Sequence, residues 1–82
     1  MMNLERLNAG LSGLGMKVTA GTTEAGHPQI EATIETKRGL LYVFAIDKGG
    51  RLAKPNGTVK YLYGCTEAKL RAVVLQTIKA NS

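Results

Sequence analysis

The stretch that decides the fold is residues 40–46, which read LLYVFAI and form the longest uninterrupted apolar run of the chain. Successive side chains of an extended strand point to opposite faces, so both faces of this segment are apolar. The two sets are Leu41, Val43 and Ala45 on one face and Leu40, Tyr42, Phe44 and Ile46 on the other. Such a segment is typical of a central strand that is covered on both sides.

Alternating segments on either side of this run predict three further strands. Residues 16–22 and 30–35 alternate apolar and polar side chains, and a turn rich in Gly and Pro separates them. Residues 58–63 alternate again, with Val59, Tyr61 and Tyr63 on one face. Between these strands, residues 47–57 are rich in Gly, Lys, Pro and Asn, and are predicted to form one long loop.

A helix is predicted at each end of the chain. Leucines spaced three and four residues apart predict a helix over residues 3–13, with Asn3 as its N-cap. Thr66 is the predicted N-cap of a second helix that ends near Ala80. The expected fold is therefore α+β: a four-stranded antiparallel meander with an N-terminal and a C-terminal helix, in the order α-β-β-β-β-α.

With both helices on one face of the sheet, the second apolar face of the central strand needs another cover. A second copy of the chain is the first candidate, which predicts a homodimer. A nucleic-acid base or a different protein comes next. The composition of this central strand therefore predicts a binding partner as well as a fold.

Size and composition exclude several classes of protein. Residues 1–82 are long enough for one small globular domain with a thin core. The single cysteine, Cys65, excludes an internal disulfide, and together with the lone His27 it makes a poor metal site. We expect no cofactor, no metal and no enzymatic activity, because no nucleophile–base pair is visible. We also expect a cytoplasmic protein without a membrane segment, since the longest apolar run is far too short to span a bilayer.

Positive charge is concentrated in the second half of the chain. Residues 1–36 contain two cations and four carboxylates, whereas residues 37–82 contain nine cations and two carboxylates. The formal net charge is +5. Such an asymmetry creates a field that attracts anions, so we expect an anionic partner.

Two sets of side chains are the candidate binding residues. The cations that we expect to contact phosphates are Lys37, Arg38, Lys48, Arg51, Lys54 and Lys60. The aromatic residues that we expect to stack bases or to form an interface are Tyr42, Phe44 and Tyr61, together with Tyr63, on strands predicted to be adjacent. Core or dimer packing is the alternative for the aromatic set, and a solvated surface is the alternative for the cations.

Two functions fit these features. The first is a small basic module that binds nucleic acid through phosphate contacts from residues 37–60. The second is a protein–protein interaction module, such as a small inhibitor or regulator, that docks on an acidic surface of a larger protein. The sequence does not distinguish DNA from RNA, or single from double strands.

Overall fold

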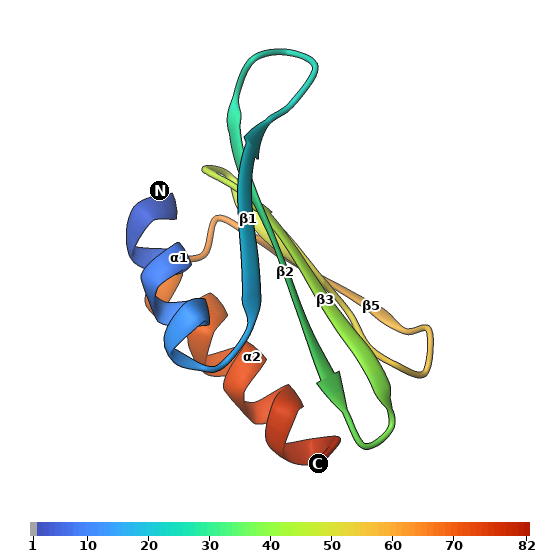
Figure 1. Cartoon of the computed structure of the whole chain (residues 1–82). Helices are drawn as coiled ribbons and strands as arrows, with labels where there is room; N and C mark the ends of the chain where they lie inside the picture. The colour runs from blue at the N-terminus through green and yellow to red at the C-terminus, as the bar shows by residue number, and fades with distance from the viewer. Residues whose placement is uncertain (1) are drawn as a thin grey trace.

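The computed structural model describes residues 2–82, in which two helices lie on one face of a five-stranded antiparallel sheet (Figure 1). The elements along the chain are α1 (Leu4–Gly13), β1 (Lys17–Thr22), β2 (Pro28–Thr36), β3 (Gly39–Ile46), β4 (Gly49–Ala53), β5 (Val59–Tyr63) and α2 (Glu67–Ala80). The strands follow one another across the sheet in chain order, which is a meander. The predicted α+β class, the meander and the two terminal helices are confirmed.

The prediction of four strands is wrong, because β4 forms within the segment expected to be one long loop. Gly49–Ala53 pairs with β3 on one side and with β5 on the other, and Leu52 is fully buried. Glycines are depleted in strands, so Gly49 and Gly50 made this segment look like a loop in the sequence. Gly50 serves close packing instead: a Cβ there would lie 3.0 Å from the Phe44 carbonyl oxygen and 3.1 Å from Leu70 Cδ2.

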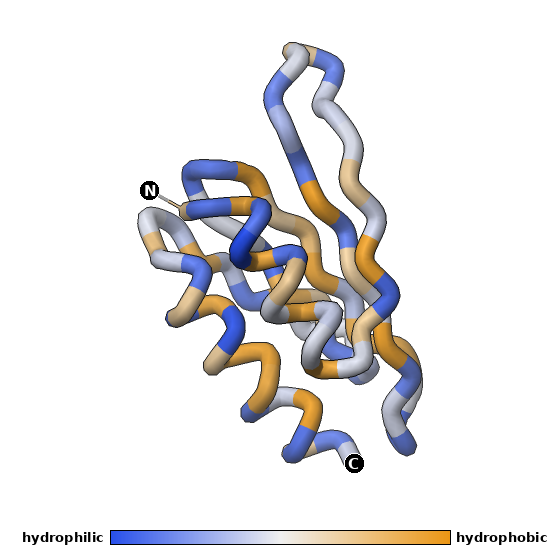
Figure 2. The backbone as a smooth tube through the Cα atoms, turned by 60° about the vertical axis from the view of Figure 1, so that its left-hand side comes forward, coloured by the Kyte–Doolittle hydropathy of each residue, from blue (hydrophilic) through white to orange (hydrophobic). Residues whose placement is uncertain are grey.

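The core lies between the sheet and the two helices. Its buried side chains include Leu7 and Leu11 of α1, Ile30 and Ala32 of β2, Leu41, Val43 and Ala45 of β3, Leu52 of β4, and Leu70 and Val74 of α2. Figure 2 shows hydrophobic and hydrophilic residues alternating along the hairpin of β1 and β2. The helices are thus held by one continuous apolar layer.

The predicted helix caps are confirmed. The Asn3 side chain accepts a hydrogen bond from the backbone N–H of Arg6 at 3.1 Å, and Thr66 Oγ1 accepts one from Lys69 at 3.2 Å. These bonds satisfy N–H groups that have no partner within a first helical turn. Within residues 2–82, neither helix combines the length and the apolar character needed to cross a membrane.

Candidate functional site

One face of the sheet is left uncovered by both helices, and we call it the open face (Figure 1). The strand register identifies the side chains of this face, because residues opposite one another on adjacent strands point to the same side of the sheet. The main open-face side chains are Glu31 and Thr33 of β2, Tyr42, Phe44 and Ile46 of β3, Arg51 of β4, and Tyr61 and Tyr63 of β5. The prediction that the second face of the central strand lacks a cover from the chain's own helices is confirmed.

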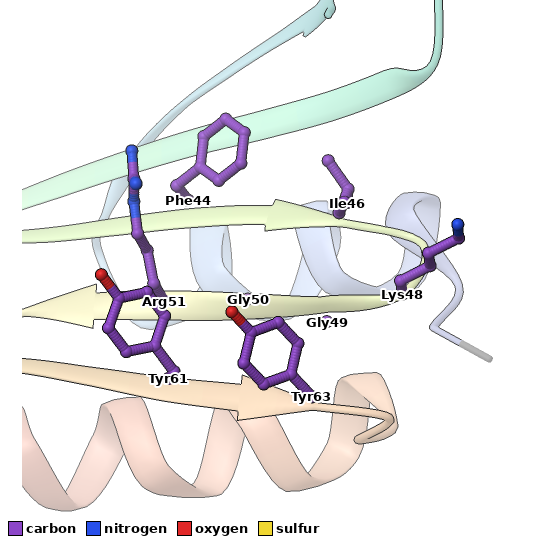
Figure 3. A pocket seen from close by; sticks show the side chains of 8 residues that line it. All are labelled: Phe44, Ile46, Lys48, Gly49, Gly50, Arg51, Tyr61 and Tyr63. Atoms are coloured by element: carbon purple, nitrogen blue, oxygen red, sulfur yellow. The ribbon is translucent and has the colours of Figure 1, made fainter.

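A hollow of about 170 Å³ lies in the open face over β4. Phe44 and Ile46 border it on the β3 side, and the two tyrosines of β5 border it on the other (Figure 3). Its floor is Gly49 and Gly50, which carry no side chains. The hollow exists because the strand between two aromatic rows contributes backbone alone at this point.

Two exposed tyrosine rings form a flat surface beside the hollow, which we call the aromatic platform. The rings of Tyr61 and Tyr63 are nearly parallel, with an angle of 3° between their planes and 6.1 Å between their centroids. They lie side by side over the β4–β5 edge of the sheet (Figure 3). Tyr61 is 56% exposed and Tyr63 is 80% exposed, so the platform adds little to the core.

Cations stand at two ends of the hollow. Arg51 extends from β4 toward β3, where its guanidinium carbon lies 5.0 Å from the Phe44 ring centroid (Figure 3). Guanidinium groups are attracted to the faces of aromatic rings, which holds this side chain over Phe44. Lys48 follows β3 in the turn at the other end of the hollow. An anionic group that entered the hollow would lie between two positive charges.

The β2 side of the open face is acidic. Glu31 lies in the same cross-strand row as Phe44, Arg51 and Tyr61, on the far side of Phe44 from the platform. Burial is the main cause that raises the pKa of the Tyr42 hydroxyl, and the negative charge of Glu31 adds to it, while Arg51 opposes the shift. The open face is therefore divided into an acidic half on β2 and an aromatic, basic half on β3 to β5.

The six predicted cations are not gathered on one surface. Lys48 and Arg51 line the hollow, but Lys37 and Arg38 lie in the β2–β3 turn. That turn adjoins the β4–β5 turn, which begins at Lys54, since the position of a Cβ on Gly39 is 3.3 Å from Pro55 Cβ. The β3–β4 turn, with Lys48, is at the opposite end of these strands.

Lys60 lies on the helix side of β5, because it pairs with the buried Leu52. Together with Lys54 it borders a groove of about 250 Å³ against the last turns of α2, beside Thr77 and Asn81. Cations near the C-terminus of a helix complement its partial negative charge. These two lysines therefore lie apart from the hollow.

The aromatic residues are brought onto one face, but not onto adjacent strands as predicted. β4 separates the row of Tyr42 and Phe44 from that of Tyr61 and Tyr63. This intervening strand is what creates the hollow. Sequence reasoning missed Ile46, Gly49 and Gly50 as site residues.

A signal for these three residues was present in the chain. Ile46 has the same parity as Phe44 along β3, and glycines within a strand can mark a place that other groups approach closely. Leu52, an apolar residue within the polar stretch, was the other indication.

The other candidate residues lie outside the hollow. His27 is exposed in the β1–β2 turn, where its backbone N–H donates to Thr23 Oγ1 at 3.1 Å. Cys65 is partly buried, and its thiol donates to the Leu62 carbonyl oxygen at 3.6 Å. Within residues 2–82, no group of three or more His, Cys, Asp or Glu side chains is placed to hold a metal ion.

Comparisons with models of protein families, with curated proteins and with solved structures find no match to this chain.

Proposed function

We propose that this protein is a small, non-enzymatic module that binds nucleic acid with the open face of its sheet. The observation that carries the proposal is the aromatic platform of Tyr61 and Tyr63, exposed beside a hollow that Lys48 and Arg51 border. Aromatic rings on an open sheet stack bases, and neighbouring cations contact phosphates. A cytoplasmic location is part of this proposal.

The charge distribution supports an anionic ligand that approaches from the β3 to β5 side. The net charge of +5 raises the rate of encounter with polyanions. Glu31 on β2 repels a phosphate chain, which restricts such a ligand to the half that holds Arg51. The role of Lys37, Arg38 and Lys54 in this proposal is long-range attraction at one end of the sheet, and Lys60 lies outside the contact.

The test is fluorescence anisotropy with labelled single-stranded DNA, duplex DNA and duplex RNA at low salt. We expect binding to at least one of the three, with an affinity that falls steeply as salt rises. Absence of any anisotropy change with all three ligands at low salt would contradict the proposal.

A second candidate function is docking on an acidic surface of a larger protein. It is favoured by two exposed aliphatic side chains on the open face, Leu40 at 49% and Val59 at 42%. They lie at the end of the sheet that carries the Lys37 and Arg38 turn, and aliphatic groups beside cations suit an acidic protein partner. Under this alternative, Leu40→Ala weakens partner binding and Tyr63→Ala does not.

Homodimerisation remains part of the proposal, through the edge of the sheet. β1 is an edge strand in which five of six residues are exposed, and its unpaired backbone groups can pair with a second copy. Such a dimer leaves the hollow and the aromatic platform free for ligand.

A further inference from the structure

The dimensions of the aromatic platform point to the kind of nucleic acid that fits it. We infer that the ligand is an extended single strand, two consecutive bases of which lie flat on Tyr61 and Tyr63. This inference rests on the proposed nucleic-acid binding and adds strand state, contact geometry and sequence tolerance to it.

The spacing and orientation of the two tyrosine rings determine which arrangement of bases fits them. Their centroids are 6.1 Å apart and their planes are parallel within 3°. Successive residues of one strand in a DNA duplex are about 3.4 Å apart along the axis. In a duplex these neighbours lie face to face, whereas two bases that each cover one of the side-by-side tyrosines lie beside one another, so they must be unstacked, as in an open single strand.

The rings of Tyr61 and Tyr63 are exposed, so a ligand can reach their faces. In a duplex, the faces of the bases are covered by their neighbours in the stack, and only their edges are open in the grooves. A flat platform offers ring faces rather than donors and acceptors aimed at base edges. It therefore suits unpaired bases, and it is tolerant of sequence because every base has a π face.

The strand register keeps the aromatic platform uncovered by neighbouring side chains. The register pairs Tyr63 with Gly49 and Tyr61 with Arg51. No side chain rises from Gly49 beside the Tyr63 ring, and a Cβ there would meet the Leu62 carbonyl oxygen and Tyr63 Cα. Arg51 turns away toward Phe44. The outward face of each tyrosine ring is therefore uncovered, because Gly49 has no side chain and because the cation–π contact with Phe44 holds Arg51 away.

Two cations lie beside the aromatic platform, at positions that a bound strand would pass. The two tyrosines are two residues apart on β5, so a strand that covers both runs along β5. Lys48 and Arg51 border the hollow at its two ends, within the half of the open face that lacks carboxylates. The backbone of the ligand would pass these two cations while its bases cover the rings.

The test compares three labelled probes of equal length: oligo(dT), an abasic oligomer with the same sugar–phosphate backbone, and duplex DNA. We expect oligo(dT) to bind more tightly than the other two at one salt concentration. Tyr61→Ala and Tyr63→Ala should each weaken oligo(dT) binding by about 5-fold to about 100-fold, and Tyr63→Phe should retain it. Leu40→Ala, also exposed on the open face but outside the platform, is the matched control and should change affinity by less than about 2-fold.

The outcomes separate this inference from the proposed function. Equal affinity for the three probes, unchanged by Tyr61→Ala and Tyr63→Ala, would overturn the inference and leave phosphate-driven binding intact. No binding of any probe would overturn the inference, and no binding of duplex RNA as well would overturn both. Should the alanine variants fail to fold, the fluorescence of Tyr61 and Tyr63 in the Tyr42→Phe variant decides the matter, since the chain has no Trp. Quenching by oligo(dT) and not by the abasic oligomer supports stacking, and equal quenching refutes it.

Discussion

Gly50 allows close packing of β4 against its neighbours because it has no side chain. It lies in β4 under α2, and a Cβ would contact the Phe44 carbonyl oxygen at 3.0 Å and Leu70 Cδ2 at 3.1 Å. These contacts are shorter than ordinary van der Waals separation, so Phe44 and Leu70 must shift by a few tenths of an ångström to admit a methyl group. The glycine is a packing requirement rather than a source of flexibility.

Gly50→Ala should lower the free energy of unfolding by about 1–3 kcal/mol, because the added methyl group overpacks the core. The control is Gly13→Ala at the end of α1, where no atom lies within 4 Å of the new Cβ. That change should raise the free energy of unfolding by about 0.4–1 kcal/mol, since alanine restricts the unfolded chain. Urea titrations of both variants measure the two effects, and equal stability of Gly50→Ala and the parent would contradict the packing account.

Glu67 joins the N-terminal ends of the two helices. Its Oε2 accepts a hydrogen bond from the Asn3 backbone N–H at 3.2 Å, and Arg6 lies 3.9 Å from its other oxygen. Hydrogen bonds from its own backbone N–H and from that of Asn3 lower the pKa of the carboxyl below its ordinary value of 4.5, and Arg6 adds to the shift. The charged form is thus favoured in the folded protein.

Because the folded pKa lies below the unfolded one, the unfolded chain binds more protons between the two values, so stability rises with pH there. The contribution of Glu67 is complete above the unfolded-state pKa and is lost as pH falls through the folded pKa. We expect an NMR titration of the Glu67 carboxyl to have its midpoint below 4.5. Glu67→Gln should make the free energy of unfolding less dependent on pH below about 5. A midpoint at or above the ordinary value would contradict this account.

At the scale of elements, β4 decides both the fold and the site. It joins β3 to β5 and sets their aromatic rows apart, so its glycine backbone becomes the floor of the hollow. It also fixes which side of the sheet each cation occupies. Arg51 of β4 faces the hollow, whereas Lys60 of β5 faces the last turns of α2.

Neutralising these two cations should therefore have different effects on the salt dependence of binding. For single strands, each lost phosphate contact reduces the slope of log affinity against log salt by about 0.7. Arg51→Gln should reduce the slope by about that amount, and Lys60→Gln should leave it unchanged within about 0.2. Anisotropy titrations of oligo(dT) over a range of salt concentrations measure both slopes. A larger loss for Lys60→Gln would move the contact surface to the groove beside α2.

The same strand marks how far sequence reasoning reaches. The period of four leucines predicts α1, alternation predicts β1, β2 and β5, and the uninterrupted apolar run predicts β3. β4 was not predicted because Gly49 and Gly50 have no side chains, so the segment shows no alternation of apolar and polar residues. The aromatic residues of the site were therefore predictable, but the hollow was not. The shape of the hollow depends on how β3, β4 and β5 pair with one another, and a local sequence pattern does not give that pairing.

At the scale of the whole molecule, the two faces of the sheet are unequal. One is sealed by α1 and α2, and the other exposes tyrosines and aliphatic side chains. We propose that this exposed apolar surface is an interaction site. The asymmetry of the layers, more than the total charge, is what supports a binding function.

Edge pairing predicts a dimer whose population rises with protein concentration. Sedimentation velocity at several concentrations measures it, and we expect oligo(dT) binding to continue in the dimer because β1 is at the opposite edge from β5. A strictly monomeric protein at all concentrations would contradict the edge-pairing part of the proposal. Loss of oligo(dT) binding on dimerisation would show instead that a second copy covers the open face.

The central claim is that the open face is the surface that binds nucleic acid. Amide chemical-shift mapping by NMR, with a short unlabelled oligo(dT) added to the labelled protein, tests it most directly. We predict that the largest shifts fall in residues 44–51 of β3 and β4 and in Tyr61 and Tyr63, while α2 is little affected. Shifts concentrated in α2 and the Lys54–Lys60 groove, or none at saturating oligo(dT), would contradict the claim.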